Sequence, residues 1–301
     1  MAFATFSETC FYTYTANRHR LGINTNNKAM RKVTMFKKLA ISTALAGASV
    51  FASNAALAGC GDVSRADLLD HAKMVVADKN GGFGLPMWVS MVDETGKVCH
   101  VVNTGGSGAM IGNTSWLGSR VISAQKANTA NDFSLDGYSI STAILYRTVQ
   151  GDNSLFGLQL SNPVDPFVAY NGDPKFYGTP KDPMVGKRPG GINVFGGGLA
   201  LYKKEGKGSR KVGAIGVSGD TSCTDHVVAW KIRAMLELDN VPAGFTNTNF
   251  KADGSPLDLG GAKGDELVLN DSGNADAAGW AHPACPNTAS ASIDGGAILR
   301  K

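Results

Sequence analysis

The chain has 301 residues, of which 18% are charged, and a formal net charge of +4. Residues 1–58 contain seven Lys/Arg and a single Glu, so the remaining chain carries 22 basic and 24 acidic side chains, a net charge of −2. Such a chain offers no basic surface to neutralise phosphates, which excludes nucleic acid as a partner.

Residues 35–58 have the pattern of a secretory signal peptide. The basic start Met35-Phe-Lys-Lys38 precedes an apolar stretch over residues 39–51 and an Ala56-Leu-Ala58 cleavage pattern. The apolar stretch is too short to span a membrane. Residues 1–34 show no apolar periodicity, and we interpret them as a non-native upstream extension, with true initiation at Met35. We therefore expect a periplasmic or secreted protein.

Cleavage of this leader leaves four cysteines: Cys60, Cys99, Cys223 and Cys285. An even number of cysteines in an exported chain indicates disulfides, and three pairings are open. We favour Cys60–Cys99, which would fix the new N-terminus beside the second strand, and Cys223–Cys285, which would fix the tail beside the last helix. Two alternatives remain. Leu57-Ala-Gly-Cys60 also resembles a lipoprotein cleavage box, and Cys223 with His226 has the spacing of half a metal site.

About 240 residues remain after the leader, enough for one domain with a sizeable core. The first expected element is a helix over Val63–Ala77, with Ser64 as its N-cap and an acid three positions later. Strands are expected at Met87–Val92 and Lys97–Asn103, joined as a hairpin by the turn Asp93–Gly96.

The next elements are helices over Trp116–Phe133 and Ser139–Val149. Residues 151–190 contain six prolines with aromatic side chains among them. We expect this segment to be ordered, either as a cover on the sheet or as a functional loop. Further strands are expected at 192–195, 199–203 and 211–217, followed by a helix over 221–236. Residues 237–301 read as a Gly/Asp-rich C-terminal tail packed on a domain that spans 59–236.

The transition from the last strand to the last helix is the most informative stretch. A small-residue strand runs through Gly213 and Gly216 into Ser218-Gly219-Asp220, and then into the helix. Asp220 or Thr221 can cap that helix with a side-chain oxygen. A helix N-terminus of this kind could hold an anionic group, although we favour the simpler interpretation of a tightly packed corner.

This stretch, residues 212–230, resembles the hallmark strand and final helix of the GlcG/HbpS-like haem-binding family, in an exported and disulfide-containing branch. Three further segments fit the family in the same order: Met87–Gly96, Ser119–Ala130 and Gly190–Tyr202. The resemblance implies an α+β fold, a profilin-like three-layer α/β/α arrangement with an antiparallel sheet of about five strands. It also implies haem as the ligand and assembly into a homo-oligomer.

Given the resemblance, His226 is the candidate axial ligand for haem iron, because imidazole suits iron. A histidine satisfied by a local hydrogen bond is the alternative. Lys126 and Arg188 are candidates to pair with haem propionates, and Asp220 completes the cofactor-binding set. The sequence contains no Cys-x-x-Cys-His motif, which excludes covalent haem attachment.

We therefore expect an exported small-molecule-binding protein for haem or a related tetrapyrrole, in haem capture or redox sensing, with a membrane sensor as a partner. One alternative is an enzyme that acts on a small oxygenated metabolite at Lys126, Asp220 and His226; another is a structural or assembly protein. We favour binding over catalysis. Ser218 lacks the spacing of a nucleophile elbow, and adjacent residues on a helix, such as Asp225 and His226, point about 100° apart.

Overall fold

The structure is a computed structural model that describes residues 59–151, 153–242, 264–269 and 281–287, together with three two-residue strands between 292 and 300. All of these residues belong to one compact unit, Ser53–Lys301. The upstream extension and the signal peptide lie outside the described residues.

The helices are α1 (Arg65–Ala77), α2 (Gly118–Asp132), α3 (Thr142–Thr148), α4 (Leu158–Ser161), α5 (Pro166–Ala169) and α6 (Ser222–Met235), with 3-10 turns η1 (Ala109–Asn113) and η2 (Pro174–Phe176). The strands are β1 (Trp88–Val92), β2 (Val98–Asn103), β3 (Gly198–Glu205), β4 (Gly208–Ser218), β5 (Leu267–Val268), β6 (Ser292–Ile293), β7 (Gly296–Ala297) and β8 (Leu299–Arg300). The expected cap at Ser64 is confirmed, because its side chain accepts a hydrogen bond from the Asp67 N–H.

The central sheet has four antiparallel strands in the order β2-β1-β4-β3. The additional strand expected at 192–195 does not form. Its backbone N–H groups have side-chain partners instead: Asn193 donates to Thr129 Oγ1 on α2 at 3.0 Å, and Phe195 donates to Asn193 Oδ1 at 3.2 Å. Pairing with a neighbouring β-strand would need those backbone N–H donors. The stretch therefore crosses the end of α2 without joining the sheet.

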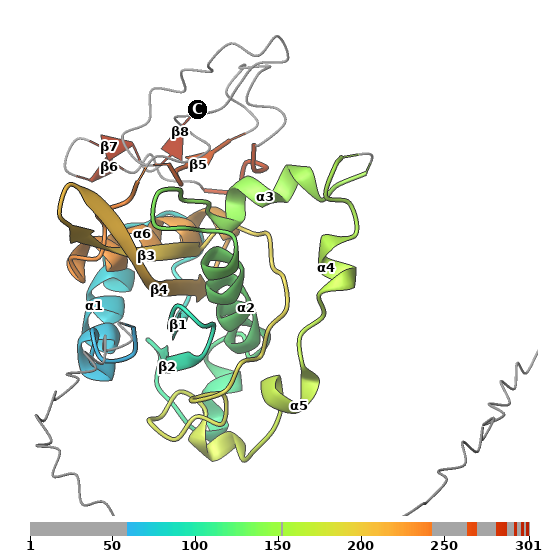
Figure 1. The fold of residues 1–301 in the computed structure, drawn as a ribbon. Coiled ribbons are helices and arrows are strands. Elements are labelled where there is room, and N and C mark those ends of the chain that lie inside the picture. The colour runs from blue at the N-terminus through green and yellow to red at the C-terminus, as the bar shows by residue number, and fades with distance from the viewer. Residues whose placement is uncertain are drawn as a thin grey trace, which may run out of the picture. The chain divides into compact units, whose positions relative to one another are not determined.

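Helices cover both faces of the sheet, which confirms the three-layer arrangement (Figure 1). Alternate residues of β1 divide between the two faces. Val89 and Met91 pack in the core beneath α1 and α6, whereas Trp88 and Val92 pack in a second core against α2. The chain is therefore an α+β domain with two apolar layers, one on each side of an antiparallel sheet.

Helix α2 approaches β4 closely because Gly216 has no side chain. A Cβ at Gly216 would lie 1.9 Å from the Ser123 carbonyl oxygen and 2.5 Å from the Ala127 nitrogen. Next to this contact, the hydroxyls of Ser90 on β1 and Ser123 on α2 are hydrogen-bonded at 2.7 Å. These contacts fix α2 over the centre of the sheet, and they fix the position of Lys126, one turn later.

The proline-rich segment 151–190 is ordered, as expected, and folds into α4, α5 and η2 along one side of the domain (Figure 1). Tyr177 and Met184 from this segment are buried in the core beneath α2. Phe156 and Phe167 remain 68% and 83% exposed. The segment thus covers the α2 side with one part and presents apolar side chains to solvent with another.

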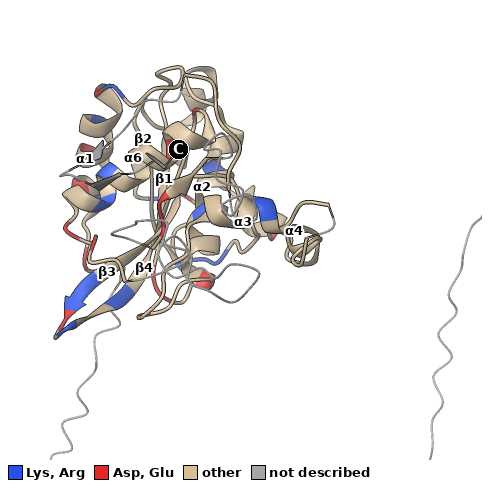
Figure 2. Ribbon diagram, turned by 90° about the horizontal axis from the view of Figure 1, so that it is seen from above, with Lys and Arg blue, Asp and Glu red and all other residues tan. Residues whose placement is uncertain are grey.

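The ribbon in Figure 2, coloured by residue type, shows several Lys and Arg positions on the β3–β4 hairpin. The tip residues of this hairpin, Glu205 and Gly208, are exposed. Among the described residues, no helix is both long and apolar enough to be a candidate for crossing a membrane.

Candidate functional site

The candidate site lies at the corner where β4 ends and α6 begins. Thr221 is the N-cap of α6, and its side chain accepts a hydrogen bond from the Thr224 N–H. The Asp225 carboxylate, in the first turn, accepts from the backbone N–H of Asp220 at 3.0 Å. Thr221 thus satisfies one of the free N–H groups in the first turn of α6, and Asp225 ties that turn back to Asp220.

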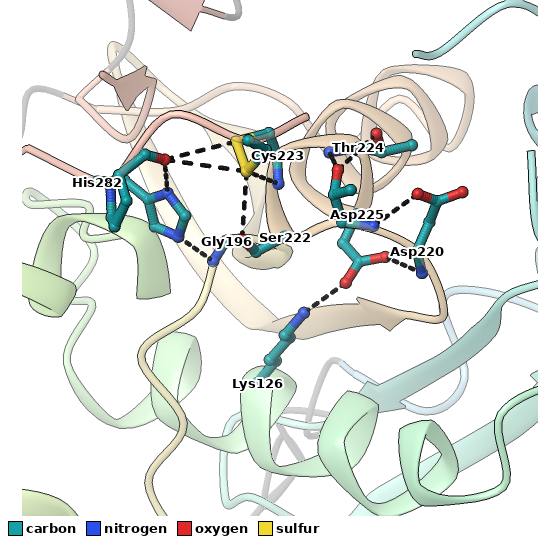
Figure 3. Close-up of a disulfide and its surroundings, with 11 residues drawn as sticks. Lys126, Gly196, Asp220, Ser222, Cys223, Thr224, Asp225 and His282 are labelled. Carbon is teal, nitrogen blue, oxygen red and sulfur yellow. Dashed lines mark hydrogen bonds and ion pairs between the residues drawn. A yellow bond between two sulfur atoms is a disulfide. The ribbon is translucent and has the colours of Figure 1, made fainter. Parts of the chain in front are cut away.

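A buried ion pair lies beneath this corner. Lys126 Nζ on α2 lies 2.8 Å from Asp225 Oδ2 and donates to the Val217 carbonyl at 3.0 Å (Figure 3). The two side chains are only 1% and 2% exposed. Burial raises the pKa of Asp225 to about 6, although the Lys126 charge acts in the opposite direction. The pair ties α2 to both the end of β4 and the start of α6.

Asp220 holds a neighbouring loop rather than an open site. Its carboxylate accepts from the Phe83 N–H at 2.9 and 3.0 Å and from the Leu85 N–H at 3.1 Å. It also accepts from the Thr221 N–H at 2.6 Å. A Cβ at Gly82 would lie 2.2 Å from Asp220 Oδ1. This carboxylate therefore organises the turn that leads into β1.

The space in front of α6 is filled by the loop at Gly196 and Gly197. A Cβ at Gly197 would lie 2.6 Å from the Val217 oxygen, 2.9 Å from Asp225 Cβ and 3.2 Å from Lys126 Nζ. A Cβ at Gly196 would lie 2.5 Å from the Ser222 carbonyl oxygen. The glycines are needed for this close packing. The loop thus occupies the space in front of the first turn of α6, which favours the interpretation of a tightly packed corner.

His226 is completely buried, with no exposed area. Neither ring nitrogen makes a hydrogen bond of normal geometry, although the Asp265 backbone is close enough to raise the pKa slightly. Burial, followed by the nearby charge of Arg233, lowers the pKa of His226 well below its usual value. The imidazole is therefore neutral, as an iron ligand must be, but it is covered on all sides.

His282, from the tail, lies on the other side of the glycine loop and is 2% exposed. Its Nδ1 donates to the Pro283 carbonyl at 2.8 Å, and its Nε2 accepts from the Gly196 N–H at 3.3 Å. Burial lowers the pKa of His282 to about 4. The tail histidine is thus a neutral imidazole of fixed tautomer, packed against the loop that covers Lys126.

Arg188 is not part of this cluster. Its exposed guanidinium donates to the Thr95 carbonyl at 2.8 Å and to Thr95 Oγ1 at 2.6 Å, at the β1–β2 turn. Lys126, Asp220 and His226 therefore come from one region of the fold, while Arg188 lies elsewhere. Lys126 and Asp220 are also already engaged, each in several hydrogen bonds.

Both favoured disulfides are present: Cys60–Cys99 and Cys223–Cys285. The second one lies on the first turn of α6 and holds residues 281–287 against the corner (Figure 3). A second link to the tail is the buried pair of Arg233 on α6 and Asp265, with an Nη1–Oδ2 distance of 2.6 Å. The tail is thus part of the core that covers His226.

Two buried ion pairs were missed by the sequence reasoning. Besides Arg233–Asp265, Arg120 on α2 pairs with Asp182 (Nε–Oδ2 2.9 Å) and stacks on the Tyr177 ring at 3.8 Å from its centroid. Each pair joins residues far apart in the chain, so no local spacing indicates it. The pairs anchor the 151–190 segment and the tail to the domain.

A small pocket with a volume of about 170 Å³ lies beside the turn that Asp220 holds, since Leu85 both lines the pocket and donates to the Asp220 carboxylate. It is lined by Leu85, Pro86 and the run 112–116 that ends in Trp116. Trp116 is 54% exposed, and the neighbouring Leu117 is 48% exposed. Large apolar side chains left in solvent beside a pocket are a common mark of a binding surface.

Comparison with known proteins gives a family for the domain. Residues 64–233 match the family model described as haem degrading protein HbpS-like. No curated protein matches the chain significantly.

Solved structures with a similar fold include three with low sequence identity. The ORFY protein of Klebsiella pneumoniae, a DUF336 protein, is 20% identical over 58% of this chain and 90% of its own, with a TM-score of 0.38. PduOC, solved as a haem complex, is 19% identical over 59% of this chain and 97% of its own, also at 0.38. Ybr137w is 17% identical over 57% of this chain and 75% of its own, with a TM-score of 0.31.

Proposed function

The chain belongs to the HbpS-like family, and we propose that it is an exported protein that binds haem or a related tetrapyrrole, in haem capture or redox sensing. The observation that carries the proposal is the family match over residues 64–233. That range contains all four sequence segments on which the resemblance rests.

Export is supported by two independent features. Residues 35–58 have the signal-peptide pattern, and the mature region contains two disulfides, which persist in oxidising compartments. Within this proposal, 1–34 is an upstream extension, 59–236 is the binding domain and 237–301 is its tail. Pairing of Cys60 with Cys99 favours a disulfide over a lipid anchor at Cys60.

The intact mass of the periplasmic product tests export. We expect a chain that begins near Gly59 or Cys60 and lacks four thiol hydrogens, because both disulfides are formed. A product that retains residues 35–58 would contradict the signal peptide, and acyl groups on Cys60 would favour the lipoprotein alternative.

For the tetrapyrrole we propose the surface around Trp116. The flat faces of a porphyrin are apolar and stack on aromatic rings. A pocket of about 170 Å³ is smaller than those that enclose a ligand, so it would hold one edge of the macrocycle. Trp116 of the lining is exposed, and the exposed side chains of Phe83, Met110 and Leu117 lie close to the lining residues in the sequence; together these side chains would cover a face of the macrocycle.

We propose His226 as an iron ligand only for a form of the protein in which the tail has moved away from it. Its imidazole is neutral, as coordination requires, but Asp265 and His282 of the tail and the glycine loop lie against it, and it has no exposed area. Iron would reach His226 after displacement of the tail, which the Cys223–Cys285 disulfide restrains. In this proposal, reduction of the Cys223–Cys285 disulfide frees the tail and gives haem iron access to His226.

A haemin titration followed in the Soret region tests these points. We expect saturable binding to the oxidised protein, weakened by Trp116→Ala and unaffected by His226→Ala. In a Cys223→Ser/Cys285→Ser background, where the tail is released without a reductant or free thiols, His226→Ala should change the Soret position. His71→Ala is the matched control, because His71 lies half-buried on α1, away from the tail. A change caused by His71→Ala and not by the other variants would place the ligand on α1.

The same titration separates binding from catalysis. The family description mentions haem degradation, so we follow the Soret band over time with and without a mild reductant. A band that persists supports a binding protein. Progressive loss of the band that depends on the protein would favour an enzyme.

We also propose that the domain assembles into a homo-oligomer and binds a membrane sensor protein. Exposed apolar side chains on the 151–190 segment support assembly: Phe156, Leu160, Phe167 and Tyr170. Sedimentation velocity tests it, with Phe167→Ser expected to shift the protein towards the monomer.

A further inference from the structure

The Cys223–Cys285 disulfide lies beside a third group that can bind a metal. The two Sγ atoms and one ring nitrogen of His282 lie within 4.8 Å of one another. Cys223 comes from the first turn of α6, while His282 and Cys285 come from one short stretch of the tail (Figure 3). Two thiolates and an imidazole are a ligand set that Zn²⁺ uses in proteins, with a fourth position left for water.

We propose that reduction of the Cys223–Cys285 disulfide creates a binding site for a thiophilic divalent cation such as Zn²⁺, formed by Cys223, Cys285 and His282. A dithiol supplies two electrons and two protons: the S–S bond breaks, two thiols form, and the dithiol becomes a disulfide. Zn²⁺ then displaces both thiol protons to the buffer. In the oxidised protein each sulfur is bonded to the other, so the site is gated by redox state.

The surroundings of the sulfurs suit thiolates. The Cys223 backbone N–H lies 3.2 Å from Cys285 Sγ, and Ser222 Oγ lies 3.5 Å from the same sulfur. Both groups can donate to a thiolate once the disulfide opens. Cys223 itself lies in the first turn of a helix of 14 residues, where the helix dipole favours negative charge. Two donors thus lie at Cys285 Sγ and the helix dipole acts at Cys223, whereas the Pro283 carbonyl oxygen, 3.7 and 3.8 Å from the two sulfurs, favours thiols until a cation binds.

A histidine that binds a metal usually donates its other ring N–H to a nearby acceptor, which fixes the ring, and His282 is held in the same way. His282 Nδ1 donates to the Pro283 carbonyl at 2.8 Å, which leaves the Nε2 lone pair available. At present Nε2 has only the 3.3 Å contact with the Gly196 N–H, which a metal bond would replace. Coordination through Nε2 would keep the Pro283 hydrogen bond and thus the orientation of the ring.

The movement required is small and local. In a tetrahedral site with Zn–S bonds near 2.3 Å, two sulfurs lie about 3.8 Å apart, so they separate by less than 2 Å from bonded contact. The Cα atoms of Cys223 and Cys285 are already 6.0 Å apart. Cys285 is partly exposed whereas the other two ligands are buried, so water reaches the fourth position from the Cys285 side.

The other disulfide has a third group too, but a less suitable one. Asp93 lies within 4.8 Å of both sulfurs of Cys60–Cys99. Its Oδ1 already accepts from Thr95 and from the Lys97 N–H, and its Oδ2 pairs with Lys97 Nζ at 3.1 Å. We therefore place the site on the α6 side. The consequence is that a metal replaces the covalent link and keeps the tail on the domain under reducing conditions.

A Co²⁺ titration of the haem-free protein tests this proposal, because tetrahedral cobalt thiolates have characteristic absorption bands that Zn²⁺ abolishes. The test uses a Cys60→Ser/Cys99→Ser background, so that one pair of cysteines remains, and a phosphine as the reductant. The phosphine takes the oxygen of water and leaves two thiols. We expect no tetrahedral bands in the oxidised protein and one Co²⁺ per chain after reduction.

The His282→Gln variant in the same background decides the ligand set. We expect at least ~10-fold weaker Co²⁺ binding, since loss of an outer hydrogen-bonding partner alone costs about that much. His71→Gln is the control and should bind as the background does. Equal affinity in His282→Gln, or no tetrahedral bands after reduction, would overturn the proposal.

Circular dichroism shows whether the Cys60→Ser/Cys99→Ser background folds. If it does not fold, a second experiment tests the proposal with Cys60 and Cys99 intact. The reduced full-length protein is compared with its Cys223→Ser/Cys285→Ser variant, both with Cys60 and Cys99 intact. The proposal expects one tetrahedral Co²⁺ fewer per chain in the variant. An equal number in both proteins would contradict it.

Discussion

Asp225 shows how one carboxylate can hold a corner together. Its oxygens accept from Lys126 Nζ and from the Asp220 N–H, and its side chain is 2% exposed. Removing one partner from such a pair leaves an unpaired buried charge, which costs far more than the pair contributes over an apolar replacement. The residue types suggested a ligand site, whereas the contacts show a structural link between α2, β4 and α6.

The first prediction concerns this pair. Lys126→Met should lower the free energy of unfolding by about 3–5 kcal/mol, because Asp225 stays buried without its cation. The control is Lys97→Met, which breaks the pair with Asp93 where Lys97 is 41% exposed, and should cost no more than about 1 kcal/mol. Urea unfolding measures both. Equal losses for the two variants would show that the buried pair has no special weight.

At the level of elements, the contact of α2 with β4 sets the position of everything at the corner. Helix α2 lies over β4 at Gly216, and Lys126 reaches from α2 to the end of that strand. The glycine loop at Gly197 then closes over Lys126. Each step depends on a missing side chain, so Gly216 and Gly197 are packing residues.

The second prediction is that Gly216→Ala strongly destabilises the domain. The new Cβ would lie 1.9 Å from the Ser123 carbonyl oxygen, so α2 must move away from the sheet. We expect a loss of at least about 3 kcal/mol in urea unfolding. Gly118→Ala is the control, since nothing lies within 4 Å of a Cβ at that position on the same helix. A change below 1 kcal/mol for Gly216→Ala would contradict the close contact.

Over the whole molecule, several titratable groups are held neutral by burial. The pKa values of His100, His226 and His282 are all lowered, with burial as the first cause in each case. In the unfolded chain these histidines take up protons near pH 6.5. The unfolded state therefore binds more protons below that pH, and the folded state loses stability as the pH falls.

The third prediction follows from this balance: stability should decrease from pH 6.5 to pH 4. The lowering of the His282 pKa to about 4 alone should reduce the free energy of unfolding by about 3 kcal/mol between pH 6.5 and pH 4. Asp225 opposes it, because a pKa raised to about 6 gives the folded state an extra proton between pH 6 and 3.8. Thermal unfolding across the window should show a shallower slope in His282→Gln. An unchanged slope would mean that His282 titrates normally.

Much of this fold follows from local patterns in the sequence. A Ser64 cap predicted α1, and the turn Asp93–Gly96 between two expected strands predicted the β1–β2 hairpin. The strand expected at 192–195 failed because Asn193 and Phe195 bond to side chains, which periodicity does not register. The pairing of Arg233 with Asp265 depends on how the tail folds back, so local spacing gave no sign of it.

The disulfide pairing was predictable from the sequence, whereas the burial of His226 was not. Four cysteines allow only three pairings, and the expected positions of the elements favoured one of them. His226 was chosen for its residue type and its helix, whereas its burial is decided by tail residues near Asp265 and His282. Only the folded chain shows that the tail covers it.

Native mass spectrometry of the mature, oxidised protein with haemin tests the central claim most directly. The account predicts a folded chain with both disulfides that gains the mass of one haem at saturation, with less gain in Trp116→Ala at the same haemin concentration. A folded, disulfide-bonded protein that gains no haem mass over a saturating titration would contradict haem binding as the function of this domain.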